Sequence, residues 1–182
     1  MIKHLSLLVT IVFALFGQHV LACTSVIVSG RVTPDGRPYI FKNRDTPNVD
    51  NLEMVVQGRG YTFLATVAAQ DSLASNIWAG HNEKGFAIFD TDAYNLNGKS
   101  EFQESHPAKW YETHGEGWLM RRALETCASL RDFEHMLDSL LRPLYCNGNI
   151  ACMDGDGNVA YYEVGNNGFV KYSRHQKLSI YN

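Results

Sequence analysis

The sequence is poor in charge and contains no basic run. Charged residues make up 19% of its 182 residues, and the formal net charge is -3 at pH 7. A surface that binds the phosphate backbone of nucleic acid usually carries clustered positive charge, so we expect no nucleic acid as a partner. The sequence also lacks internal repeats and low-complexity segments, and one folded domain is therefore the expected organisation.

Cysteine is scarce, and its spacing is not that of a zinc site. The four cysteines are Cys23, Cys127, Cys146 and Cys152, without a CxxC pair among them. We therefore expect no metal, and no organic cofactor is implied. If Cys23 stays free, at most one disulfide can form among the other three, and spacing alone does not assign it.

One acidic stretch, DGDGN at 154–158, resembles the start of a calcium-binding loop. Such a loop needs a bidentate glutamate at its twelfth position, where this chain has Gly165. A hairpin turn is therefore the favoured interpretation of this stretch.

Only the N-terminus carries a long apolar run. The run from Leu5 to Phe16 is interrupted by a single serine and a single threonine, and small or modest side chains precede Cys23. It is too short to span a membrane and has the layout of a signal peptide. The sequence thus predicts a signal peptide at 1–22, a mature domain at 23–182 and export to the periplasm or the medium, with no transmembrane span after processing.

The mature sequence begins with a predicted hairpin. Residues 24–30 are rich in β-branched side chains, residues 33–36 (TPDG) favour a turn, and residues 37–45 predict a returning strand. With the turn centred on Pro34 and Asp35, Cys23 would face Thr46, within a register error of about two residues. The segment KNRD at 42–45 should therefore return beside Cys23.

Further strands and two helices follow this hairpin. Strands are predicted at 52–57 and 61–69, and strand–turn–strand units at 75–90 and 149–165. Between them, residues 117–143 have helical periodicity, with Ser129 and Asp132 forming a capping box for the second helix. Residues 95–116 are the least periodic and are interpreted as a loop over a pocket. This order predicts an α+β fold, with helices packed on a largely antiparallel sheet.

A cysteine at a new N-terminus suits nucleophilic catalysis. Its thiolate is the nucleophile, and nearby cations favour the thiolate form. The freed α-amino group has an ordinary pKa of about 7.7–8.0, so it can accept the thiol proton near neutral pH. An enzyme built in this way is inactive until the residues before the cysteine are removed.

These features resemble the N-terminal nucleophile (Ntn) hydrolases of the choloylglycine hydrolase and isopenicillin N acyltransferase type. The matching segments are CTS at 23–25, KNRD at 42–45, GHNEKGFAI at 80–88 and DGDGNVAYYEV at 154–164. The resemblance implies an αββα sandwich that hydrolyses linear amide C–N bonds or transfers their acyl groups. No segment after Val164 matches the later strands of such proteins, so the chain is expected to hold the N-terminal part of the sandwich.

The resemblance also implies roles for five residues. Cys23 matches the nucleophile, and Asp45 matches the carboxylate that orients the nucleophile and its amine. Asn82 matches the asparagine whose amide stabilises the oxyanion. Lys42 and Asn43 are the expected substrate-binding residues, although many bile-salt hydrolases have arginine at the position of Lys42.

Several alternatives stay open at this stage. The sequence VLAC loosely fits a lipobox, so Cys23 is alternatively the lipid anchor of a non-catalytic binding domain, and an inactive truncated relative is a further alternative. Asn82 and Asp45 are alternatively turn residues, and Lys42 a solvated charge. The expected partner is a small-molecule amide. Bile-salt, N-acyl amino acid and penicillin-like amides all remain candidates, and a homo-oligomer is left open.

Overall fold

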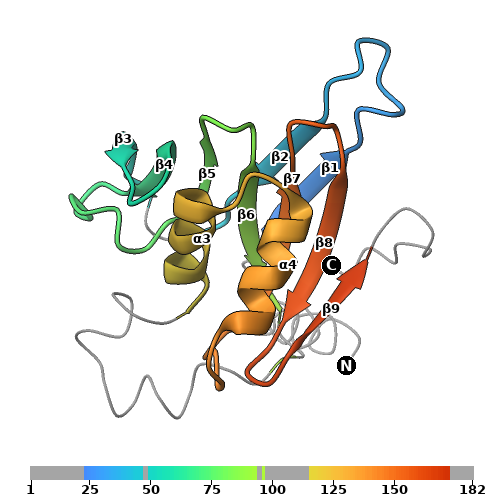
Figure 1. Cartoon of the computed structure of the whole chain (residues 1–182). Coiled ribbons are helices and arrows are strands. Elements are labelled where there is room, and N and C mark those ends of the chain that lie inside the picture. Colours follow the sequence, from blue (N-terminus) through green and yellow to red (C-terminus); the bar gives the residue numbers. More distant parts are fainter. Residues whose placement is uncertain (1–22, 47–48, 94–95, 97–114, 173–182) are drawn as a thin grey trace, which may run out of the picture.

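The computed structural model describes residues 23–46, 49–93, 96 and 115–172. The predicted signal peptide and most of the predicted loop at 95–116 lie outside the described residues. The elements in chain order are β1 (Thr24–Val28), β2 (Tyr39–Asn43), β3 (Asn51–Gln57), β4 (Thr62–Ala68), β5 (Ala79–Asn82), β6 (Ala87–Asp92), α3 (Gly115–Thr126), α4 (Leu130–Ser139), β7 (Gly148–Met153), β8 (Val159–Val164) and β9 (Phe169–Tyr172), as Figure 1 shows.

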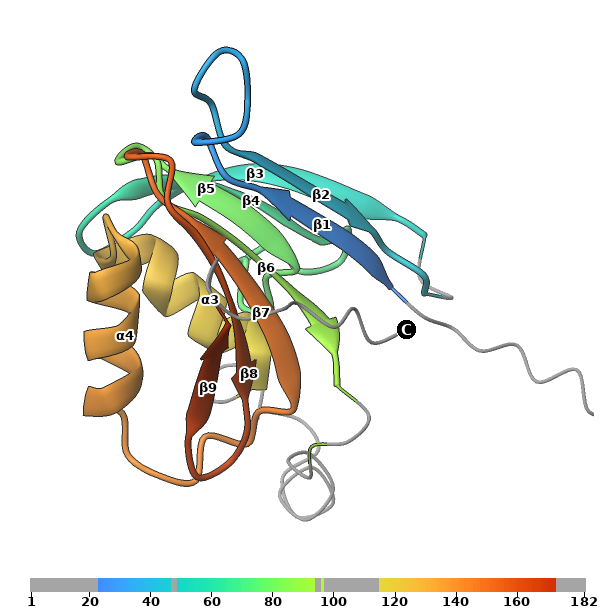
Figure 2. The ribbon, with the colours of Figure 1, turned by 90° about the vertical axis from the view of Figure 1, so that its right-hand side faces the viewer.

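The strands form two antiparallel sheets. Strands β3 to β9 follow one another in a seven-stranded sheet, and β1 pairs with β2 in a separate two-stranded sheet. In Figure 2, α3 and α4 lie on one side of the larger sheet and the β1–β2 hairpin lies on the other. The predicted α+β class is confirmed, and these layers are three of the four in an αββα sandwich.

The main core lies between the larger sheet and the two helices. Alternate residues of β4 (Phe63, Ala65 and Val67) are buried in it, as expected for a strand with one covered face. From α4, Phe133 packs edge-on against Tyr162 of β8, with ring centroids 5.1 Å apart. Each such buried side chain contributes roughly 1.5–3 kcal/mol to folding, so this layer holds the larger sheet against the helices.

The local signals read from the sequence are confirmed. The Ser129 hydroxyl accepts the Asp132 N–H, and the Asp132 carboxylate accepts the Ser129 N–H, which is the predicted capping box. The acidic stretch at 154–158 is the turn between β7 and β8. One oxygen of the buried Asp154 accepts the N–H groups of Asp156 and Asn158, as in a tight turn. Strand β9 was not predicted, because it has only four residues and follows a Gly/Asn-rich turn.

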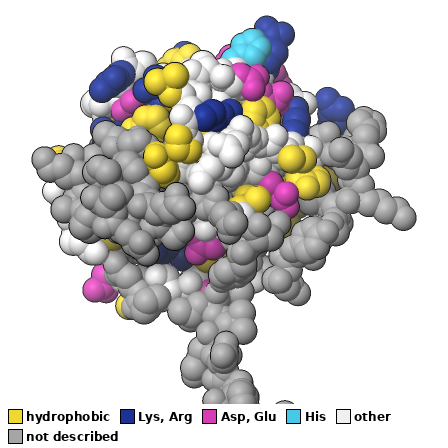
Figure 3. All heavy atoms as spheres, turned by 90° about the horizontal axis from the view of Figure 1, so that it is seen from below, with side chains coloured by type: hydrophobic (Ala, Val, Ile, Leu, Met, Phe, Trp, Pro, Cys, Tyr) yellow, Lys and Arg dark blue, Asp and Glu magenta, His cyan; other side chains and the backbone are white. Residues whose placement is uncertain are grey.

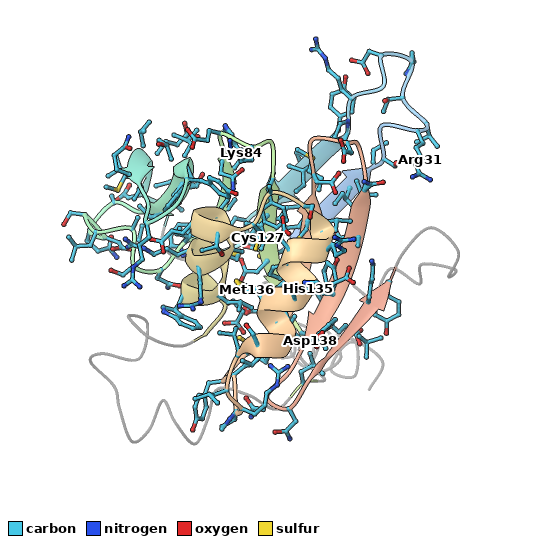
Figure 4. All side chains as sticks on the ribbon, viewed as in Figure 1. Arg31, Lys84, Cys127, His135, Met136 and Asp138 are labelled. Atoms are coloured by element: carbon cyan, nitrogen blue, oxygen red, sulfur yellow. The ribbon has the colours of Figure 1, made fainter. Side chains whose placement is uncertain are left out.

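The β1–β2 hairpin is fastened to the larger sheet along its length. At its turn end, the Gly157 carbonyl accepts the Gly30 N–H at 3.3 Å and the Ser29 hydroxyl at 3.0 Å. From the hairpin loop, the Arg31 guanidinium donates to the Asn158 side chain in the turn between β7 and β8 (Figure 4). Near the other end, the Ser25 and Tyr161 hydroxyl groups are 2.8 Å apart. These contacts determine where the start of β1 lies.

The outer face of the hairpin is apolar and exposed. Val26, Tyr39 and Phe41 all point away from the larger sheet with large exposed areas. This is the face that the fourth layer of an αββα sandwich would cover.

Charge of both signs is mixed on the visible surface. Seen from below, in Figure 3, acidic and basic side chains of the described residues are interspersed with hydrophobic ones. Within the same residues, no helix is long and apolar enough to cross a membrane.

Candidate active site

The hairpin register places Cys23 opposite Arg44. Thr24 pairs with Asn43 and Ser25 pairs with Lys42, so one further step along the same register leads from Cys23 to Arg44. The predicted pairing of Cys23 with Thr46 is therefore wrong by two residues. The cause is the turn, which is centred one residue earlier in the chain than expected.

The two-residue period of the strands separates the predicted site residues. Cys23, Lys42 and Arg44 are half-buried and lie on the face toward the larger sheet. Asn43 is exposed on the outer face of β2, and Asp45 beyond its end is exposed as well. The structure thus brings Cys23 and Lys42 to one face and leaves Asn43 and Asp45 outside it. The roles implied for all four remain predictions.

Lys42 forms an ion pair between the two sheets. Its ammonium group donates to the Asp90 carboxylate at 2.9 Å and to the Trp78 carbonyl at 3.0 Å. Only 11% of the Lys42 side chain and 19% of the Asp90 side chain are exposed. The alternative of a solvated strand charge is therefore wrong. Lys42 thus links β2 to β6, and the Asp90 carboxylate offsets its positive charge in the absence of a substrate.

Arg44 stacks on an aromatic ring beside this ion pair. Its guanidinium carbon lies 2.8 Å from the centroid of the Trp78 ring. Burial lowers the pKa of Arg44 from its ordinary value. The negative charges of Cys23 when ionised, of Asp90 and of Asp92 act in the opposite direction, because they favour a charged guanidinium. Two cations and two carboxylates therefore gather near the start of β1.

Sequence reasoning did not assign Trp78, Asp90 and Asp92 to the site. The carboxylates stand in FDTD, at the end of the strand that follows the Asn-Glu-Lys-Gly turn. A signal was available for Arg44, since it belongs to the KNRD segment that was expected to return beside Cys23. No local pattern marks Trp78 as the ring on which it stacks.

The amide of Asn82 is fully engaged away from Cys23. The residue is buried, and its nitrogen donates to the carbonyls of Leu124 at 2.9 Å and Cys127 at 2.8 Å. Its oxygen accepts the N–H groups of Lys84 and Phe86, each at 3.1 Å. An asparagine amide has two donor hydrogens, and both are used here.

This geometry favours the interpretation of Asn82 as a structural residue. Its amide shapes the β5–β6 turn and donates to the carbonyls of Leu124, in the last turn of α3, and Cys127, just beyond it, where backbone carbonyls need partners from outside the helix. The helices and the hairpin cover opposite faces of the larger sheet (Figure 2), so the Asn82 amide is directed toward the helix layer and Cys23 lies in the other one. The oxyanion role stays a prediction that this arrangement does not support.

The thiols differ in accessibility. Cys127, in the connection between α3 and α4 (Figure 4), is buried, and so are Cys146 and Cys152. Burial raises the pKa of Cys127 to about 11 and that of Cys152 well above its ordinary value. None of the four cysteines forms a disulfide, and Cys23 alone is partly exposed.

Replacing Lys42 with methionine should lower the free energy of unfolding by about 2 kcal/mol, because it leaves a mostly buried carboxylate without its cation. Asp90→Leu should cost a similar amount. The double variant should cost clearly less than the sum, because it leaves no uncompensated charge. Urea unfolding measures the free energy of unfolding of all three variants.

Arg37→Met, which removes the exposed Arg37–Asp35 pair, is the matched control and should change the free energy of unfolding little. Additive costs for Lys42 and Asp90 would show that the pair does not couple the sheets.

Comparison with protein-family models matches residues 32–181 to the model described as acyl-coenzyme A:6-aminopenicillanic acid acyl-transferase. The matched range covers most of the chain. It contains Lys42, Asn43, Asp45 and Asn82 and begins shortly after Cys23. A comparison with curated proteins finds no match.

Proposed function

Because the chain belongs to the acyl-coenzyme A:6-aminopenicillanic acid acyl-transferase family over residues 32–181, we propose that it cleaves or exchanges linear amide C–N bonds with Cys23 as the nucleophile. Membership of this Ntn-type family supports an acyl-transferring or amide-cleaving function in general. One observation carries the choice of nucleophile. Cys23 is the partly exposed thiol, and it stands at the start of β1 on the face that also holds Lys42 and Arg44.

The proposed reaction proceeds through an acyl-thioester. The Cys23 thiolate attacks the amide carbon, and the electron pair of the C=O bond moves onto oxygen. Collapse of this intermediate breaks the C–N bond, and the amine leaves with a proton. Water or a second amine then attacks the thioester and restores the thiol. No group other than the chain and its substrates is needed to balance these steps.

The proton carrier in this proposal is the α-amino group of Cys23. It is available only after residues 1–22 are removed, so processing and activation are the same event. The group accepts the thiol proton and returns it to the leaving amine. Asp45 follows Arg44 directly and is proposed to orient this amine. The proposal does not require Asn82, whose amide serves the β5–β6 turn.

The intact mass of the exported protein tests this proposal most directly. A chain that begins at an unmodified Cys23 is expected. Incubation with bile-salt, N-acyl amino acid and penicillin-like amides should add the mass of the amide minus that of the released amine, which is one acyl group in place of the thiol hydrogen. The adduct should disappear with hydroxylamine, which cleaves thioesters. A different first residue, or a diacylglyceryl mass on Cys23, would contradict the proposal, and the second result would establish the lipid-anchored alternative.

A further inference from the structure

We propose that Arg44, held over the Trp78 ring, is a positioning residue that supplies a fixed positive charge to the thiolate of Cys23. This inference deepens the proposed function and rests on it. It assigns a role to a residue that the comparison with known families does not single out.

The hairpin geometry brings the two side chains together. The register of β1 and β2 leads directly from Cys23 to Arg44, and both side chains lie on the face toward the larger sheet. Ionised Cys23 is also among the charges that act on the Arg44 guanidinium. By contrast, Asn43 and Asp45 on either side of Arg44 are exposed. Within the KNRD segment, Arg44 is therefore the side chain directly across from the thiol.

The Trp78 ring makes the position of this charge definite. A guanidinium is planar and stacks on an aromatic face, which a lysine ammonium cannot do in the same way. Trp78 is itself held at both backbone groups, because its N–H donates to the Thr66 carbonyl at 2.9 Å and its carbonyl accepts from Lys42. Arg44 thus lies over the ring of a residue whose backbone is fixed by β4 on one side and by Lys42 of the hairpin on the other.

Arg44 is one of four charged groups near the thiol, together with Lys42, Asp90 and Asp92. Lys42, the other cation of the segment, is paired with Asp90 at 2.9 Å, and the two charges largely offset each other. Asp92, at the end of β6, is exposed, so solvent screens it more strongly than the half-buried guanidinium. Removal of the Arg44 charge is therefore expected to make the potential at the thiol less positive, with Asp90 and Asp92 acting on the same guanidinium.

Two alkylating reagents measure that field. Iodoacetate is anionic and iodoacetamide is neutral, and both consume the same thiolate, so the ratio of their rates reports the local potential and not the amount of thiolate. The other three cysteines are buried, so labelling of the purified chain is expected at Cys23. Arg44→Met should lower the iodoacetate-to-iodoacetamide ratio about threefold, as for one charge acting across about 6 Å of nearly aqueous medium.

Further variants distinguish the loss of the Arg44 charge from a loss of folded structure. Arg44→Lys should restore part of the ratio, and Trp78→Leu should lower it although Arg44 is kept. Arg31→Met, at the far end of the same hairpin, is the matched control and should leave the ratio unchanged. Continued protection of the three buried thiols shows that each variant is folded. An unchanged ratio in folded Arg44→Met would overturn the inference. Absence of amide turnover in the unaltered chain would instead defeat the proposed function, and the ratio would still decide the inference.

Discussion

Replacing Cys23 with alanine is expected to abolish turnover of the amide that the processed chain cleaves best. Loss of the nucleophile removes the covalent route, and deletions of this kind cost on the order of 10⁶ in turnover in well-studied hydrolases. The thermal midpoint should hardly change, because Cys23 is partly exposed and precedes the first paired residue of β1. Steady-state kinetics on the best amide of the panel, together with a thermal melt, measure both quantities.

The neighbouring residue supplies the control for this experiment. Thr24 is exposed on the outer face of the hairpin, so Thr24→Ala should retain most of the activity. Cys23→Ser keeps the size of the side chain and should also lose most of the turnover, because a hydroxyl group is a much weaker nucleophile than a thiolate near neutral pH. Turnover by folded Cys23→Ala that matches the unaltered chain would rule out Cys23 as the nucleophile.

Replacing Asn82 with alanine should lower the free energy of unfolding by roughly 3–5 kcal/mol. The change removes four hydrogen bonds, three of them buried and one, to the Lys84 N–H, partly exposed. Each polar group left unpaired in the buried region costs about 1–3 kcal/mol before relaxation. A loss of this size approaches the total stability of many domains, about 5–15 kcal/mol. Urea unfolding measures the change, and turnover should fall only as the folded fraction falls.

A second asparagine provides the comparison. Asn51 is exposed on β3, and its side chain makes a single long hydrogen bond of 3.4 Å, so Asn51→Ala should be nearly neutral. If Asn82→Ala instead keeps its stability and loses turnover by about 10²–10³, the loss typical of a missing oxyanion donor, the amide must reach the substrate in the working enzyme. The structural interpretation of Asn82 would then be wrong.

Much of the fold was predictable because its signals are local. The capping box at Ser129 and Asp132, the Asn-Glu-Lys-Gly turn and the alternation of β4 each depend on residues that lie close together in the chain. The hairpin register was predicted two residues away from its observed value. An even slip keeps every side chain on its face, so the KNRD segment still returns beside Cys23.

Local sequence patterns predicted most of the elements, the first hairpin and the family resemblance, but β9 and the sharing of one face by predicted site residues depend on tertiary packing. Lys42 pairs with Asp90, and the Asn82 amide bonds to the end of α3, at separations of 48 and 42 residues. Such partners are brought together by the packing of the layers, and no local sequence pattern predicts them. A motif therefore identifies Asn82 as a candidate oxyanion residue or a turn residue, but only the docking of α3 on the sheet determines that its amide is directed toward the helix layer.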